Sequence, residues 1–132
     1  MTKSRKPKYP LEDKEREDRI HFEIVVDANG VDEQIMGWYH YLQDAIRFPF
    51  SAVCDIERDM SPLSNGERAE VVGMADADDC AAEMFVKVKY DRSKKKTLAV
   101  PLMQLAPNDD VEGDTREAVE DWRYWIGRGY RI

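Results

Sequence analysis

The chain has 132 residues, of which 42% are hydrophobic and 36% charged, and its formal net charge is −7. This balance fits one globular domain and excludes a disordered chain. No run approaches the roughly 20 apolar residues of a membrane helix, and an acidic chain lacks the clustered cations that nucleic acid requires.

The charge is unevenly distributed along the chain. Residues 1–19 hold seven basic and five acidic side chains, a net charge of +2, so the remainder carries −9. Residues 1–10 are predicted to form a flexible basic arm, because two prolines and four cations prevent a core there. No apolar run follows them, which predicts the absence of a secretory signal and a cytoplasmic location.

Helices are predicted over residues 11–47. In residues 11–30 the apolar side chains fit both a helical face and the alternation of a strand, and a Glu-, Lys- and Arg-rich run favours the helix. Residues 31–46 show helical spacing more clearly. Asn29 is expected to cap this second helix and Phe48-Pro49 to end it. The side chains that define its apolar face are Ile35, Trp38, Tyr39, Leu42 and Ile46.

Residues 48–106 are predicted to form a small SH3-like β-barrel. From residue 50 apolar and polar side chains alternate, as is typical of a strand. Further strands are expected near 67–74, near 83–90 and in the segment TLAVPL, and LMQL is predicted to form one helical turn. Four or five short strands within about 55 residues are typical of a small barrel or curled sheet.

A C-terminal helix is predicted over residues 114–127. Asp114 or Thr115 is expected to start it. Asp114, followed three residues later by Glu117, matches a capping box, and Gly127 can end the helix. The predicted architecture is α+β, with N-terminal helices, a small SH3-like β-barrel and a C-terminal helix in one domain over residues 11–132. The apolar face of the last helix consists of Ala118, Val119, Trp122, Trp125 and Ile126.

The motifs of enzymatic catalysis are missing from the sequence. Nucleophilic catalysis needs a base beside the nucleophile, and no hydrolase or protease signature surrounds any candidate. A P-loop and a dinucleotide-binding glycine motif are also missing. Cys54, Cys80, His21 and His40 match zinc ligands in number but not in spacing, and Cys54 is explained by a place in the core. We predict that the protein is not an enzyme.

Clustered carboxylates suggest calcium, which takes about six to eight oxygen ligands. The first cluster is Asp27, Asn29, Asp32 and Glu33. Counted from Asp27, Val31 and Asp32 stand where an EF-hand needs an oxygen ligand and glycine, so that pattern fails. Favourable interaction with a helix start explains Asp32 and Glu33 without a metal. Asp44 lies roughly 16 Å from Glu33 along the helix axis and would need ligands from elsewhere.

The second cluster is Asp76, Asp78, Asp79 and Glu83, which are four carboxylates within eight residues and have no cation among them. Such carboxylates repel one another, and either a bound cation or open solvent relieves the repulsion. An exposed loop is therefore the alternative to a metal site.

The third cluster is Asp109, Asp110, Glu112 and Asp114, followed by Glu117, Glu120 and Asp121. Counted from Asp110, the acids Asp110, Glu112, Asp114 and Asp121 take positions one, three, five and twelve of an EF-hand loop. Thr115, however, stands at the sixth position, where glycine is required. A helix start stabilised by its acidic residues is the alternative.

Several segments together resemble the cyanobacterial calcium-binding proteins of the CcbP type. They are EIVVDA, MGWYHYLQD, FPFSAVC, VVGMADADDCAAEMFV, LAVPLMQL and DWRYWIGRGY, and they run from about Arg19 to Tyr130. The resemblance implies a small acidic protein that binds calcium without an EF-hand and buffers or sequesters it. It identifies no individual ligand.

We therefore predict reversible binding of Ca²⁺ by clustered surface carboxylates, with calcium ions as the partner and no contact with nucleic acid or membrane. The alternative is an SH3-like module that binds a protein partner and has an incidental acidic surface. In that interpretation Trp38, Trp122 and Trp125 would form an aromatic groove, although tryptophans at helical spacing are more often part of a core.

Overall fold

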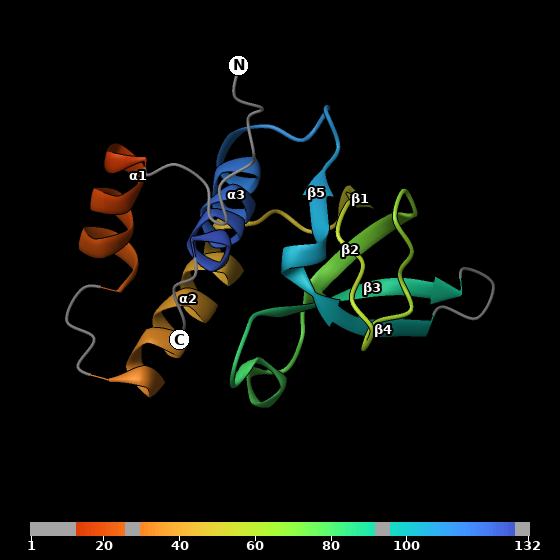
Figure 1. Cartoon of the computed structure of the whole chain (residues 1–132), viewed down its shortest axis with the longest axis horizontal. Helices are drawn as coiled ribbons and strands as arrows, with labels where there is room; N and C mark the ends of the chain where they lie inside the picture. Colours follow the sequence, from red (N-terminus) through yellow and green to blue (C-terminus); the bar gives the residue numbers. More distant parts are fainter. Residues whose placement is uncertain (1–12, 26–29, 92–95, 129–132) are drawn as a thin grey trace, which may run out of the picture.

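The computed structural model describes residues 13–25, 30–91 and 96–128 of the chain. The helices lie together on one side of a twisted sheet (Figure 1). In chain order the elements are α1 (Lys14–Arg19), η1 (Ile20–Ile24), α2 (Val31–Ala45), β1 (Phe50–Cys54), β2 (Arg68–Met74), η2 (Ala77–Cys80), β3 (Phe85–Asp91), β4 (Lys96–Pro101), η3 (Leu102–Gln104), β5 (Leu105–Pro107) and α3 (Gly113–Gly127).

The N-terminal helices are confirmed. The Asp13 side chain accepts a hydrogen bond from the Arg16 amide at 3.0 Å and caps α1, which continues into the π-helical turn η1. Ile20 and Ile24 are buried, whereas Phe22 is 73% exposed. A strand would have placed these three side chains on one face, so the burial pattern is that of a helix. The expected cap Asn29 lies outside the described residues.

The five strands form one antiparallel sheet in the order β4-β3-β2-β1-β5. The expected alternation is confirmed in β1, where Phe50, Ala52 and Cys54 are buried. The predicted helical turn after the fourth strand is also present as η3. Within the described residues β4 and β5 remain the edges of the sheet, so its closure into a barrel is not shown.

The core under the helices is aromatic. Trp38 of α2 and Trp122 of α3 are fully buried, and their rings meet edge to face with centroids 5.0 Å apart. Trp125 is 4% exposed and lies next to Trp38, at 5.8 Å between centroids. Such aromatic pairs add stability beyond the area they bury. The predicted apolar faces of both helices are therefore the faces that pack together.

The predicted capping box at the start of α3 is wrong. The helix begins at Gly113, whose φ of +67° is a conformation that favours glycine. The N-cap is Glu112, and it makes no side-chain capping hydrogen bond. Thr115 instead accepts a hydrogen bond from the Arg47 amide at 2.8 Å. That bond joins α3 to the chain just after α2, but it satisfies no N–H group of α3 and so does not cap the helix.

The described helices are all too short or too polar to cross a bilayer.

Candidate functional site

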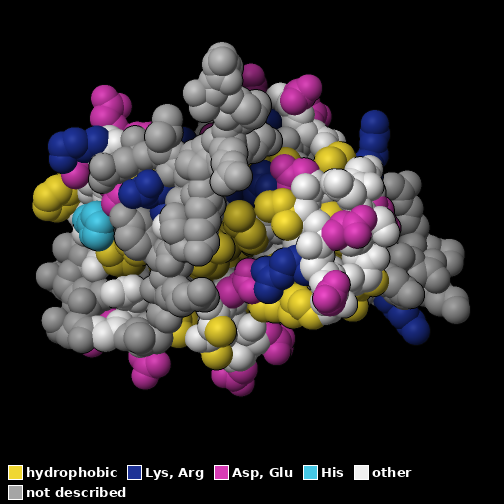
Figure 2. Space-filling view, viewed as in Figure 1, with side chains coloured by type: hydrophobic (Ala, Val, Ile, Leu, Met, Phe, Trp, Pro, Cys, Tyr) yellow, Lys and Arg dark blue, Asp and Glu magenta, His cyan; other side chains and the backbone are white. Residues whose placement is uncertain are grey.

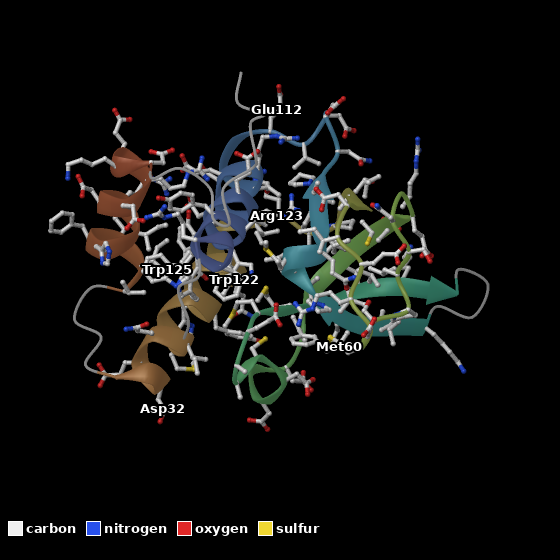
Figure 3. The ribbon with its side chains drawn as sticks, in the orientation of Figure 1. Asp32, Met60, Glu112, Trp122, Arg123 and Trp125 are labelled. Atoms are coloured by element: carbon white, nitrogen blue, oxygen red, sulfur yellow. The ribbon has the colours of Figure 1, made fainter. Side chains whose placement is uncertain are left out.

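The carboxylates of the described residues do not form a ready-made metal cage. No three Asp, Glu, His or Cys side chains in this part of the chain converge in a way that would hold an ion. Acidic side chains are instead spread over the visible face of the molecule (Figure 2). The three clusters predicted from the sequence differ in their partners and in their exposure.

The first cluster is not brought together. Asp27 lies outside the described residues, and Asp32 and Glu33 are exposed in the first turn of α2. Asp44 is exposed near the other end of the same helix, roughly 18 Å from Asp32 at 1.5 Å per residue. It lines a shallow hollow of about 440 Å³ between η1 and α2, together with Glu23 and other side chains. Sequence reasoning did not identify Glu23.

The second cluster lies on the turn η2 between β2 and β3, at the lower edge of the view in Figure 1. Asp76, Asp78 and Asp79 are all exposed there. The Asp79 amide donates to the Asp76 carbonyl oxygen at 2.9 Å and closes the turn. Asp76 precedes the 3₁₀ turn as its N-cap, and Asp78 and Asp79 lie in its first turn.

The turn is anchored at both ends. The Tyr39 hydroxyl of α2 donates to the Ala75 carbonyl oxygen at 2.7 Å. At the other end, the Phe85 amide donates to the buried Cys80 sulfur at 3.3 Å. The exposed carboxylates therefore stand on a fixed backbone. The sequence analysis placed Tyr39 on an apolar helix face and did not identify it as an anchor of this turn. A half-buried tyrosine hydroxyl needs a hydrogen-bond partner, and that need is the signal that could have indicated the contact.

The electrostatic field around η2 is negative. Burial raises the pKa of the Cys80 thiol, and the nearby carboxylates of Asp79 and Asp76 raise it further. The hydrogen bond from the Phe85 amide lowers it, but the net shift is upward. Burial also raises the pKa of Tyr39, with a further contribution from Asp76. The field of the carboxylates thus reaches the two residues that anchor the turn.

Compensation of this charge by the protein is weak. The Lys87 ammonium lies 3.7 Å from an Asp76 oxygen, and both side chains are largely exposed. An exposed pair of this kind contributes little free energy. Asp78 and Asp79 form no ion pair with any residue that the structure describes. The turn therefore keeps two or three carboxylates that a mobile cation can reach.

Glu83, the last member of the second cluster, is differently placed. Both of its oxygens accept hydrogen bonds from the Arg58 guanidinium, each at 2.9 Å. This bidentate pair raises the pKa of Arg58 and neutralises Glu83 within the protein. Arg58 lies 25 residues earlier in the chain, so no local spacing indicated the pair.

The third cluster is divided by the fold. Asp110, Glu112 and Asp114 are exposed around the start of α3. Asp121 is fully buried two turns later, where its oxygens accept hydrogen bonds from Arg19 and the Tyr41 hydroxyl. The segment whose spacing matched an EF-hand loop therefore begins in an exposed turn and ends at a buried position in the middle of α3, so it is not a loop.

The tryptophans do not form an open groove. Trp38 and Trp122 are fully buried and Trp125 is 4% exposed. The exposed large apolar side chains are Phe22, Met36 and Met60. They come from η1, α2 and the segment after β1 and so do not belong to one element. The aromatic surface expected of a protein-binding module is therefore not found in the described residues.

Comparison with known proteins gives one family. The model of the family Calci_bind_CcbP, described as calcium binding, matches residues 18–126. The crystal structure of Anabaena CcbP is 36% identical, with a TM-score of 0.79 over 93% of this chain and 98% of that one. A structure described as a calcium binding protein in the calcium-binding form is 38% identical, with a TM-score of 0.77 over 91% and 95%. The search of curated proteins found no match.

Proposed function

Because the chain belongs to the CcbP calcium-binding family, we propose that it binds Ca²⁺ reversibly through exposed carboxylates and without an EF-hand. The observation that carries this proposal is the family match over residues 18–126. The likeness to a solved calcium-binding form over most of both chains supports it. Buffering or sensing of the ion in the cytoplasm is the role that we propose for such binding.

The turn η2 is the site that the geometry favours. Its carboxylates are exposed, stand on an anchored backbone and include Asp78 and Asp79, which have no ion pair among the described residues. In the first cluster, Asp32 and Asp44 lie roughly 18 Å apart along α2. In the third, Asp121 is buried and so is separated from the exposed Asp110, Glu112 and Asp114. A calcium ion on η2 would take oxygens of Asp76, Asp78 and Asp79, and water would complete its coordination.

The expected affinity is moderate. No three ligand side chains of the described residues converge beforehand, so the ion has to draw exposed carboxylates together. That ordering costs conformational entropy and is offset by relief of the repulsion between the carboxylates. We expect a dissociation constant of roughly 10⁻⁶–10⁻³ M, within the range of calcium sites in proteins.

We also propose that the five strands curl into an SH3-like barrel. The support is the run of antiparallel neighbours and the short turn η3, which joins the two edge strands β4 and β5. This arrangement makes η2 a connection between adjacent strands on the surface. The alternative function, a protein-binding module, gains no support from the buried tryptophans.

Calorimetric titration of the whole protein with Ca²⁺, repeated with excess Mg²⁺, tests the proposed function. Calcium should give a saturable heat that magnesium does not abolish, because Mg²⁺ is smaller and keeps its waters more strongly. Calcium should also raise the melting temperature by mass action on the folded state. Absence of heat and of a thermal shift with either ion would refute the proposal.

A further inference from the structure

A guanidinium already occupies the loop that leads into α3. The Arg116 side chain donates from Nε to the Val111 carbonyl oxygen at 2.6 Å. Its Nη2 donates to the carbonyl oxygens of Asn108 at 2.6 Å and of Pro107 at 3.3 Å. Three main-chain oxygens of a single loop therefore converge on one cation.

The same loop has the composition of a cation site. Besides the three carbonyl oxygens, its exposed carboxylates are those of Asp109 and Asp110, and the exposed Glu112 follows after Val111. Carbonyl and carboxylate oxygens are the ligands that Ca²⁺ prefers. The backbone is also fixed, since the Asn108 amide donates to the Ser51 carbonyl oxygen of β1 at 3.0 Å.

The position of Arg116 opposes the local preference of a helix. It is the fourth residue of α3, and a positive charge in the first turn is unfavourable beside the helix dipole. The three carbonyl oxygens and the Glu120 carboxylate, which accepts from Nη1 at 2.9 Å, compensate for this. A side chain placed against local preference is expected to serve a tertiary or functional purpose.

We infer that Arg116 is the resident cation of the loop 107–111 and closes this loop to calcium, so that the ion binds elsewhere on the chain. Arginine suits this role because its guanidinium stays charged at any physiological pH and presents five donors. Arg116 is therefore a specificity-determining residue that limits how many ions the acidic surface takes. The inference rests on the proposed function, calcium binding.

Removal of the guanidinium should open the loop. We expect Arg116→Gln to bind one more calcium ion per chain than the unaltered protein in calorimetric titration. Adding Asp109→Asn and Asp110→Asn to that variant should abolish the extra ion. Arg116→Lys keeps the charge and should show no gain. Lys14→Gln removes an equal charge from an exposed position on α1 and should also show none.

An unchanged number of ions in a folded Arg116→Gln protein would overturn the inference, as would an equal gain in Lys14→Gln. The unaltered protein gives an independent test by NMR. The Arg116 Nε–H resonance should stay in place as calcium is added, whereas amides of η2 should shift. Movement of the Nε–H resonance in step with calcium would show that the ion enters this loop. If the unaltered protein binds no calcium at all, the result refutes the proposed function and not the role of Arg116.

Discussion

Arg19 and Asp121 form a bidentate pair in the interior of the helical layer, although 102 residues separate them in sequence. The two hydrogen bonds measure 2.6 and 2.8 Å, and Asp121 is fully buried. The Tyr41 hydroxyl donates to the same carboxylate at 2.7 Å. Its pKa is raised by burial and by this hydrogen bond. One carboxylate thus joins α1, α2 and α3.

The first prediction concerns Asp121→Asn. The substitution keeps the shape of the side chain but removes the charge that lies 2.6 Å from Arg19 and 3.3 Å from Arg16. It leaves Arg19 with the more distant Glu117 carboxylate at 3.7 Å. Breaking a buried pair from one side costs about 3–5 kcal/mol. We expect a loss toward the lower end, because the Arg19 side chain is 23% exposed. Urea unfolding followed by circular dichroism measures the loss.

The control is Asp114→Asn, which removes the same charge from an exposed position on α3. Its effect should stay within about 0.5 kcal/mol. Calcium titration of folded Asp121→Asn should give the same number of ions as the unaltered protein. A lost ion would show that Asp121 is a ligand after all.

Several parts of the fold that depend on local sequence pattern were predicted correctly. The faces around Trp38 and Trp122 followed from helical spacing, and the alternation in β1 followed from the two-residue period of a strand. Each of these two periodicities lies within a single helix or strand, and each reports which of its faces is buried, whatever element packs against it. The three helical segments and the strands β1 to β4 were therefore predictable, whereas the short strand β5 was not predicted.

Partners from distant parts of the chain were not predictable in this way. The pairs Arg19–Asp121 and Arg58–Glu83 decide which carboxylates are already neutralised, and nothing near Asp121 or Glu83 in sequence indicates them. The capping box predicted at Asp114 was also wrong, because α3 begins one residue earlier, at Gly113. The Arg47 amide, which donates to the Thr115 hydroxyl, is likewise a partner from a distant part of the chain.

The second prediction concerns Gly37→Ala. Gly37 lies where α2 passes η1, and a Cβ there would collide with the Ile24 carbonyl oxygen. Because this neighbour is backbone, the two helical segments would have to separate, at a cost of about 1–3 kcal/mol. Gly73→Ala is the control, since space is open there. Equal stability of the two variants in thermal unfolding would contradict the close approach.

The third prediction concerns alkaline pH. Burial raises the pKa of the Cys80 thiol above its ordinary value of 9.0. The unfolded chain then loses this proton at a lower pH than the folded chain does. The protonated thiol therefore makes its full contribution to the free energy of unfolding below about pH 9. That contribution is lost as the pH rises toward the pKa of the thiol in the folded protein, by up to about 1.4 kcal/mol per pH unit.

Urea unfolding of the unaltered protein and of Cys80→Ala, from about pH 8 to about pH 10.5, measures this contribution. The variant is expected to be less stable throughout, because a buried side chain is shortened. Its stability should nevertheless fall less steeply with pH. Parallel curves would mean that the buried thiol does not resist ionisation.

The last prediction locates the calcium site. The triple variant Asp76→Asn, Asp78→Asn and Asp79→Asn removes the exposed charges of η2 and leaves its anchors at Tyr39 and Cys80 untouched. If the ion binds there, affinity should fall at least about tenfold, which is about 1.4 kcal/mol. Calorimetric titration measures the affinity, and the rise in melting temperature with calcium should shrink in parallel.

The matched control neutralises Asp109, Asp110 and Asp114, which are exposed around the loop that Arg116 fills. Both triple variants change the net charge equally, so a long-range effect of charge alone would weaken binding to the same extent in each. Salt screens such effects beyond about 10 Å, whereas ligand loss persists at high ionic strength. Selective loss in the first variant at high salt therefore identifies η2 as the site. Equal losses would assign binding to the general acidic field, and selective loss in the control would place the ion at α3.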